Sequence, residues 1–221
     1  MPKGYNGKIL HVNLTDGDFT VEEPPESFYR KYLGGQGIGM YYILKEVPPG
    51  ADPLGAENVL AVTLSVVTGA PISGQSRVVT NAKSPVTKGV GAAEAGGFWP
   101  AQAKAAGFDA IIVRGKAEKP VYLWVHDGKA ELRDASHLWG RITADVEDAI
   151  RDELGDTKIE VMQIGPAGER LVNYACILNM VNRANGRTGM GAVMGSKNLK
   201  AIAVRGKGQP EVADRESLKK L

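Results

Sequence analysis

Apolar and polar residues alternate near the start of the chain in a pattern that predicts a β-hairpin. Residues 8–14 alternate with a period of two, an Asp-Gly turn follows, and the alternation resumes at residues 19–22. The same pattern returns at residues 120–126 and 130–133, which are also joined by Asp-Gly. Two hairpins of one design, about half a chain apart, indicate an internal duplication.

A second pair of segments supports the duplication. Residues 110–116 read Ala-Ile-Ile-Val-Arg-Gly-Lys and residues 201–207 read Ala-Ile-Ala-Val-Arg-Gly-Lys, so six of seven positions agree. Short apolar strands often resemble each other by chance, but the shared Arg-Gly-Lys makes chance the weaker explanation. Each segment is predicted to be a buried strand.

The parts before these two segments follow one order: an apolar strand, a turn with Gly and Pro, a second strand near an arginine, and a Gly-rich loop before a short helix. In the first half they are residues 59–67, residues 68–71, a strand from Arg77 and residues 88–97; in the second, residues 159–164, residues 165–168, a strand from Arg170 and residues 182–197. We predict two pseudo-repeats, about 1–118 and 119–210, in one domain of residues 1–210. Residues 211–221 are predicted to be a linker or the start of a further domain.

Helical periodicity is confined to four short segments, residues 26–32, 39–46, 99–106 and 143–154. Strands therefore outweigh helices, and tight turns between consecutive strands favour antiparallel pairing. The predicted fold class is α+β: a duplicated β-rich domain with two mainly antiparallel sheets and a few short helices.

Composition narrows the choice of partners. The chain has 221 residues, of which 43% are hydrophobic and 24% charged, as in folded globular proteins. Lys and Arg number 27 against 25 Asp and Glu, a net charge of +2, which gives no reason to expect nucleic acid or a lipid surface as partner. No stretch reaches the ~18 consecutive apolar residues of a membrane helix. We expect a cytoplasmic protein.

The chain has one cysteine, Cys176. One thiol cannot form an internal disulfide, a four-sulfur zinc site or a cysteine-held iron-sulfur cluster within this chain. Cys176 lies in an apolar segment, residues 171–178, which is predicted to be a strand with an inert, buried thiol. The three histidines are far apart, and we assign them no function.

Glycine accounts for 28 of 221 residues, nearly 13%, against a usual ~7%. The two Gly-rich loops stand in equivalent places, and the second, at residues 182–197, also contains Arg183 and Arg187. Glycines before a helix let backbone N–H groups converge on an anion, and arginine binds phosphate with two N–H groups. Taken alone, the first loop, at residues 88–97, is more typical of a tight turn under a close-packed helix. Neither loop has the Gly-x-Gly-x-x-Gly or Walker A spacing.

Several of these stretches together resemble one family. Residues 186–204, running from Gly-Arg-Thr-Gly-Met-Gly to Lys-Ala-Ile-Ala-Val, are similar to the most characteristic stretch of the aldehyde ferredoxin oxidoreductases, the tungsten-pterin enzymes. Further matching stretches are residues 7–14, 83–85, 107–113, 134–140 and 165–169. The resemblance covers residues 4–210 in order and concerns the family's amino-terminal domain.

The resemblance implies two six-stranded sheets that carry a bis-pterin tungsten cofactor. The positions that match the family's cofactor contacts are Arg77, Glu94, Gly96, Arg183, Ala184, Gly186 and Arg187. It implies that the arginines and loop amides hold the pterin phosphates, and that main-chain carbonyls of Glu94 and Ala184 bind a Mg²⁺ ion between them. We expect one phosphate site in each half. Asn is expected in the family at position 94, and the carboxylate of Glu94 would have to be offset by the magnesium or an arginine.

The implied activity is the oxidation of aldehydes to carboxylic acids by a tungsten (or molybdenum) enzyme, with electrons passing through a 4Fe-4S cluster to ferredoxin. This chain would carry the cofactor, while cluster ligands and catalytic residues would belong to remaining domains or a separate catalytic subunit; a homodimer also fits. We assign no catalytic residue here. One alternative is a stand-alone, non-catalytic tungstopterin-binding subunit or carrier, although the unfinished tail at residues 215–221 favours a piece of a longer protein. A generic nucleotide binder is a weaker alternative, because no acidic ribose-binding residue follows the Gly-rich loops.

Overall fold

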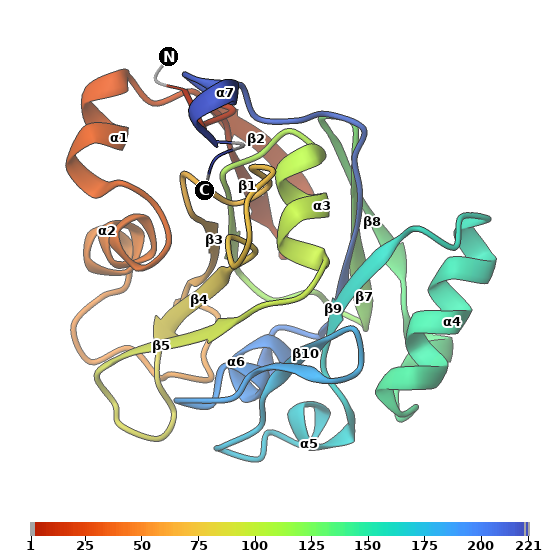
Figure 1. Cartoon of the computed structure of the whole chain (residues 1–221). Coiled ribbons are helices and arrows are strands. Elements are labelled where there is room, and N and C mark those ends of the chain that lie inside the picture. Colours follow the sequence, from red (N-terminus) through yellow and green to blue (C-terminus); the bar gives the residue numbers. More distant parts are fainter. Residues whose placement is uncertain (1–2, 219, 221) are drawn as a thin grey trace.

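Two six-stranded sheets form the body of the protein in the computed structural model, which describes residues 3–218 and 220 (Figure 1). The strands of the first sheet are β1 (Ile9–Asn13), β2 (Asp18–Glu22), β3 (Leu60–Leu64), β4 (Val78–Lys83), β5 (Val90–Ala95) and β6 (Ala110–Arg114). Those of the second are β7 (Val121–His126), β8 (Lys129–Asp134), β9 (Glu160–Gln163), β10 (Ile177–Asn179), β11 (Arg183–Asn185) and β12 (Leu199–Arg205).

The two sheets have the same topology. Their orders are β2-β1-β6-β3-β4-β5 and β8-β7-β12-β9-β10-β11, so each half arranges its six strands identically. Within the described residues, the first and last strands of each half, β1 with β6 and β7 with β12, form the one parallel pair of their sheet. The predicted α+β class, with a duplicated β-rich domain and mainly antiparallel sheets, is confirmed. The domain boundaries stay a prediction.

Helices lie outside and between the sheets. The first sheet is covered on its outer face by α1 (Glu26–Tyr32) and α2 (Gln36–Glu46), and the second by α4 (Thr143–Leu154) (Figure 1). Between the sheets lie α3 (Trp99–Ala105) and α6 (Met190–Ser196). The shorter helices are α5 (Pro166–Glu169), the single turn η1 (Ser136–Leu138) and α7 (Arg215–Leu218). The longest of these described helices has 12 residues, and none is both long and apolar enough to cross a membrane.

Burial on both faces explains the uninterrupted apolar runs of the central strands. In β6, Ile111 and Val113 face the core between the sheets, while Ile112 packs against the outer helices of the first sheet. A strand covered on both sides needs apolar residues at successive positions. Trp99 of α3 fills the inter-sheet core and donates its indole N–H to the carbonyl of Ile202 in β12, at 2.8 Å.

The two Gly-rich segments are not loops throughout, so that prediction is wrong. Residues 90–95 of the first form β5, and the second contains β11 and α6. Small residues are needed because neighbouring segments approach closely: a Cβ on Gly91 would lie 3.0 Å from Thr188 Cβ, and one on Gly191 would lie 2.4 Å from the carbonyl oxygen of Cys176. Close packing therefore accounts for part of both segments.

The strand predicted from Arg170 is also wrong in extent. Pro166 opens α5, since proline suits the first turn of a helix, and Leu171 then adopts a left-handed backbone with φ of 57°. Only Ile177–Asn179 pairs as a strand, so Cys176 lies before it and is half-buried, where we expected a buried thiol within a strand. Helix α2 begins at Gln36, ahead of the predicted residue 39.

Candidate anion-binding site

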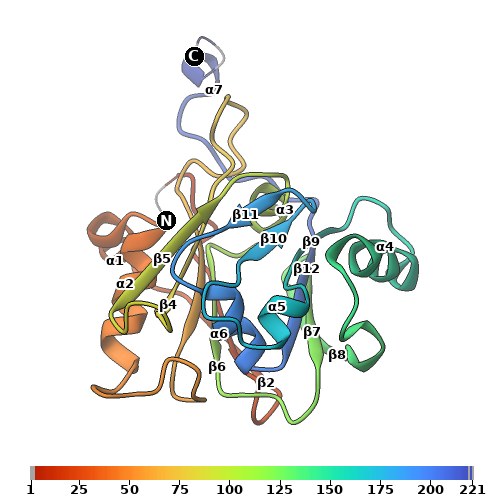
Figure 2. The ribbon, with the colours of Figure 1, turned by 90° about the horizontal axis from the view of Figure 1, so that it is seen from below.

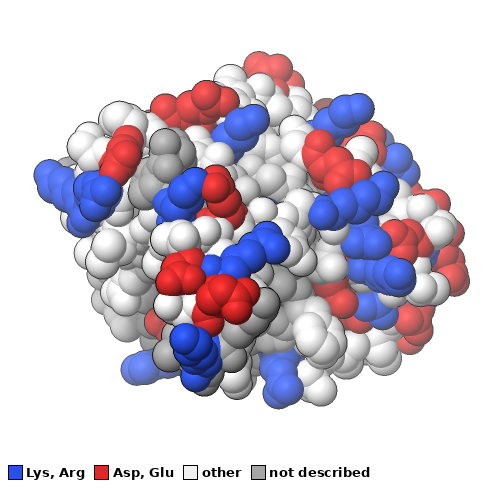
Figure 3. Space-filling view, turned by 45° about the horizontal axis from the view of Figure 1, so that its top comes forward, with Lys and Arg blue, Asp and Glu red and all other residues white. Residues whose placement is uncertain are grey.

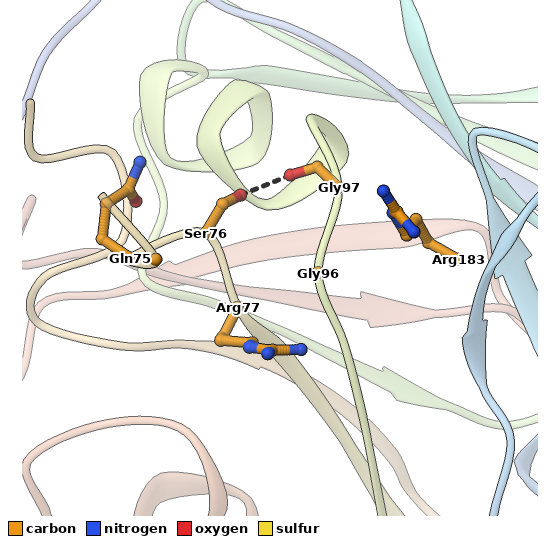
Figure 4. A pocket seen from close by; sticks show the side chains of 7 residues that line it. Gln75, Ser76, Arg77, Gly96, Gly97 and Arg183 are labelled. Carbon is orange, nitrogen blue, oxygen red and sulfur yellow. Dashed lines mark hydrogen bonds between the residues drawn. The ribbon is translucent and has the colours of Figure 1, made fainter. Parts of the chain in front are cut away.

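A pocket of about 340 Å³ lies where the two halves meet. One wall is the segment that enters β4, with Gln75, Ser76 and Arg77; the other comprises Gly97, with its neighbour Gly96, and Arg183 (Figure 4). Gly74 completes the lining. Arg77 and Gly96 come from the first half and Arg183 from the second, so the pocket requires both halves.

The chain bends sharply at Gly97 as it passes from β5 to α3. Gly97 has φ of 105°, a conformation that residues with a side chain rarely adopt. A Cβ there would also lie 2.2 Å from Asn179 Oδ1. The hydroxyl of Ser76 donates a hydrogen bond to the carbonyl of Gly97 (Figure 4). Glycine is therefore required at this position by both conformation and space.

Side chains from the second half reach the edge of the first sheet. Asn179 Nδ2 donates to the carbonyl of Gly96 at 3.1 Å, and Asn185 Nδ2 donates to the carbonyl of Ala93 at 2.8 Å. Figure 2 shows the consequence, with β5 running beside β10 and β11. These contacts hold the β10–β11 hairpin against β5.

The pocket is positively charged. Its lining includes two arginines and no acidic residue. In the described part of the chain no carboxylate lies within 4.0 Å of Arg77 or Arg183, although Arg30, Arg114 and Arg205 all have such partners. Both side chains are exposed. Two guanidinium groups without a protein counter-charge are suited to a bound phosphate or carboxylate.

The structure brings together three of the seven predicted site residues, Arg77, Gly96 and Arg183, in one pocket. The other four, Glu94, Ala184, Gly186 and Arg187, are exposed and do not line it. Glu94 and Ala184 nevertheless occupy equivalent positions in the two halves. Each lies on the terminal strand of its sheet, two residues before a glycine, which is Gly96 or Gly186.

The expectation of one phosphate site in each half stays a prediction; this pocket takes residues from both halves. Sequence reasoning also missed Gly97, Ser76 and Asn179. Gly97 and Ser76 directly adjoin predicted residues, and the second glycine of the Gly-Gly pair was a usable signal. Nothing local marks Asn179, whose partner Gly96 is far away in sequence.

Figure 3 shows basic and acidic side chains interspersed on the face that it presents. Among the residues that the structure describes, no group of three or more His, Cys, Asp or Glu side chains is arranged to hold a metal ion.

Comparison with known proteins identifies the family. The model of the aldehyde ferredoxin oxidoreductase N-terminal domain matches residues 9–206, which is most of the chain. The chain belongs to this family.

Members of the aldehyde ferredoxin oxidoreductase family are similar over nearly the whole chain. A tungsten-containing aldehyde ferredoxin oxidoreductase of Pyrococcus abyssi is 50% identical over 214 residues, which cover 96% of this chain and 35% of that protein. The WOR-like subunit of an aliphatic sulfonate oxidoreductase of Pyrococcus furiosus is 39% identical, over 98% of this chain and 37% of that protein. The chain thus spans about a third of the length of the curated relatives it matches.

A solved structure has the same fold. The active-site complex BamBC of benzoyl coenzyme A reductase, determined with 1,5-dienoyl-CoA, matches with a TM-score of 0.95 and 38% identity, covering 98% of this chain and 33% of that chain. The chain is therefore similar to proteins whose names give different substrates: an aldehyde, an aliphatic sulfonate and benzoyl coenzyme A.

Proposed function

We propose that this chain is the cofactor-binding N-terminal domain of a tungsten (or molybdenum) bis-pterin oxidoreductase. The observation that carries the proposal is the convergence of Arg77 and Arg183 on a pocket walled by Gly96 and Gly97, with no carboxylate of the described residues within 4.0 Å of either arginine. A pterin phosphate is a dianion, which such a pair of guanidinium groups would bind. The names of the relatives support tungsten as the metal.

The residues present fit such a phosphate. Gly96 keeps space in front of Arg77, because a Cβ there would lie 3.5 Å from Arg77 Nη1 and 3.4 Å from the carbonyl oxygen of Ser76. Magnesium prefers oxygen ligands, and the proposal includes main-chain carbonyls of Glu94 and Ala184 as two of them. The exposed carboxylate of Glu94 would add negative charge near the phosphates, which Mg²⁺ or the arginines would offset.

For the whole protein we propose the oxidation of aldehydes to carboxylic acids, with ferredoxin as electron acceptor. The 50% identity to an aldehyde ferredoxin oxidoreductase, against 39% and 38% to the sulfonate and benzoyl-CoA enzymes, supports this choice. When bound, the cofactor would supply the two-electron redox chemistry, and this chain's residues would bind and orient it. Cluster ligands would lie outside this chain, whose one cysteine cannot hold a 4Fe-4S cluster.

The test is the cofactor content of arginine variants purified from cells supplied with tungstate. Hydrogen bonds to charged groups contribute ~1.5–3 kcal/mol each, so Arg77→Ala or Arg183→Ala should weaken cofactor binding by roughly 10- to 150-fold. Tungsten is measured by mass spectrometry and pterin by the fluorescence of its oxidised form. Arg170→Ala, which changes an exposed arginine outside the pocket, is the control. Unchanged tungsten and pterin in the Arg77→Ala, Arg183→Ala double variant would refute the phosphate role.

Arg187 provides a graded comparison. It was predicted as a phosphate ligand but does not line the pocket. The geometry therefore predicts a smaller loss of cofactor for Arg187→Ala than for Arg183→Ala. An equal or larger loss would mean that the phosphates lie further along the chain, toward α6.

A further inference from the structure

Three contacts fix the short segment of Gly96, Gly97 and the N–H of Phe98. Two of them come from the turn between β10 and β11 in the other half. Asn179 Nδ2 donates to the carbonyl of Gly96 at 3.1 Å. The N–H of Phe98 donates to the sulfur of Met180, also at 3.1 Å. The third contact is the Ser76 hydroxyl on the carbonyl of Gly97.

The contact from Asn179 determines where the Gly97 N–H points. In a trans peptide the carbonyl of one residue and the N–H of the next point in opposite directions. The carbonyl of Gly96 points toward Asn179, so the Gly97 N–H points away from β10, toward the wall that carries Ser76 and Arg77. No acceptor for that N–H is found among the residues that the structure describes.

We propose that Asn179 and Met180 are positioning residues of the anion pocket, which orient the Gly97 N–H as a third donor to a bound phosphate beside Arg77 and Arg183. This inference rests on the proposed phosphate-binding function and deepens it. The ligand is a phosphate group that receives donors from both halves. The same hairpin carries Arg183, so one element of the second half sets two of the three donors.

The turn that contains Met180 and Val181 has an unfavourable backbone conformation. Met180 and Val181 have φ of 50° and 61°, in the left-handed region, where a β-branched residue such as Val181 is strained. The loop between β10 and β11 has three residues, 180–182, and the positive φ at its first two positions favours Gly or Asn there. Gly or Asn at position 180 would lack the sulfur that accepts the Phe98 N–H. Val181 is 43% exposed, so core packing offers little compensation for its strain.

Asn179 is also incompletely satisfied. Its side chain is fully buried, and its Oδ1 has no hydrogen-bond partner within the described residues. A buried polar group that lacks a partner destabilises a protein. Strain at residues 180–181 and an unpaired amide oxygen at Asn179, next to the Gly96–Gly97 segment that lines the pocket, are what a functional constraint on positioning would produce.

The test measures binding of inorganic phosphate to the chain by calorimetry and, in parallel, the response of the Gly97 amide in NMR. The sequence has two Gly-Gly pairs, at residues 34–35 and 96–97. Glycine labelled with ¹³C at the carbonyl and ¹⁵N at the amide therefore gives carbonyl-filtered signals from Gly35 and Gly97. Gly35 already donates to the carbonyl of Leu64 and serves as the internal control.

In the wild type we expect phosphate to shift the Gly97 signal and leave Gly35 unchanged. Asn179→Leu keeps a similar volume but cannot donate to Gly96, and should weaken phosphate binding about tenfold and remove the Gly97 shift. Asn81→Leu is the matched control: Asn81, in β4, is also buried, also donates to a carbonyl of the first sheet and also has an unpaired Oδ1, but it contacts neither the 96–97 segment nor the β10–β11 hairpin. It should keep wild-type affinity within about twofold.

The outcomes separate the two proposals. If the wild type does not bind phosphate, the proposed function fails. If it binds phosphate and loses binding in Arg183→Ala, but Asn179→Leu behaves like Asn81→Leu, the positioning role is overturned while the proposed function stands. Should Asn179→Leu not fold, Asn179→Ser in a Val181→Gly background tests the same contact. The glycine relieves the backbone strain at position 181, and the serine hydroxyl is too short to replace the amide. Wild-type affinity in that variant would equally overturn the positioning role.

Discussion

Lys197 permits a quantitative prediction about stability. It follows α6, its side chain is fully buried, and its ammonium donates to the carbonyl of Gly115 at 2.9 Å and to that of Asn58. Within the described residues no carboxylate lies within 4.0 Å of it. Burial without a counter-charge lowers the pKa of Lys197 to about 8, from 10.5 for a free lysine.

The lowered pKa makes stability rise with pH. Between pH 8 and pH 10.5 the unfolded state binds the Lys197 proton and the folded state does not, so the free energy of unfolding increases with pH in this window. Below pH 8 both states are protonated and the term is constant. The two pKa values differ by 2.5, which corresponds to about 3 kcal/mol over the whole window at ~1.4 kcal/mol per pH unit. Between pH 7.5 and pH 9.5 the gain should be about 2 kcal/mol.

The assay is urea denaturation, followed by tryptophan fluorescence at pH 7.5, 8.5 and 9.5. The wild type is compared with Lys197→Met, which keeps the length of the side chain and removes the titrating group. Subtracting the two curves isolates Lys197 from Lys104 and Lys200, whose pKa values burial also lowers. The unfolding free energy of the wild type should gain about 2 kcal/mol on that of Lys197→Met across this range. Parallel curves, or a relative gain for the methionine variant, would refute the assignment of an uncompensated buried charge.

Two further results are expected. Gly191→Ala should destabilise the protein by ~1–3 kcal/mol or prevent folding, because its Cβ would lie 2.4 Å from the Cys176 carbonyl oxygen. Gly186→Ala should be tolerated, because its Cβ would lie 3.8 Å from Ala184 Cβ. Thermal denaturation measures the stability of both variants. Burial raises the pKa of Glu147, so its contribution to stability is present below the ordinary glutamate pKa and is lost as pH rises through the raised value. Glu147→Gln should therefore lose less stability than the wild type between pH 4 and pH 7, and equal losses in urea denaturation would contradict the raised pKa.

The sequence was most informative where local pattern and final environment agree. The hairpin of β1 and β2 shows alternation in the sequence and forms as predicted, with its Asp-Gly turn between the two strands. The central strands β6 and β12 have continuous apolar runs and are buried on both faces. Their shared Arg-Gly-Lys endings revealed the duplication, which the equal strand orders confirm.

Prediction failed where the reason for a residue lies in a distant partner. Strand β5 reads Val-Gly-Ala-Ala-Glu-Ala, with Val90 as its one β-branched residue, because Thr188 and Met190 approach it closely at Gly91. Helix α6 contains two glycines because another backbone approaches it. The pocket shows the same limit. Arg77 and Arg183 are far apart in the chain and meet because their sheets place β5 and β11 side by side, which no local pattern encodes.

The two halves have the same strand order but different side chains at equivalent positions, and the pocket between them is therefore asymmetric. The repeat aligns Asp109, before β6, with Lys200, in β12, and both are buried, yet Asp109 pairs with Lys104 whereas Lys200 pairs with Glu169. The two halves thus keep the same strand order, although the side chain at this pair of equivalent positions is acidic in one half and basic in the other. The terminal strands differ likewise, since β11 contributes Arg183 and β5 leads into a Gly-Gly segment. Two sheets with the same strand order therefore contribute different hydrogen-bond donors to one pocket. Residues at equivalent positions of the repeat do not have equivalent contacts.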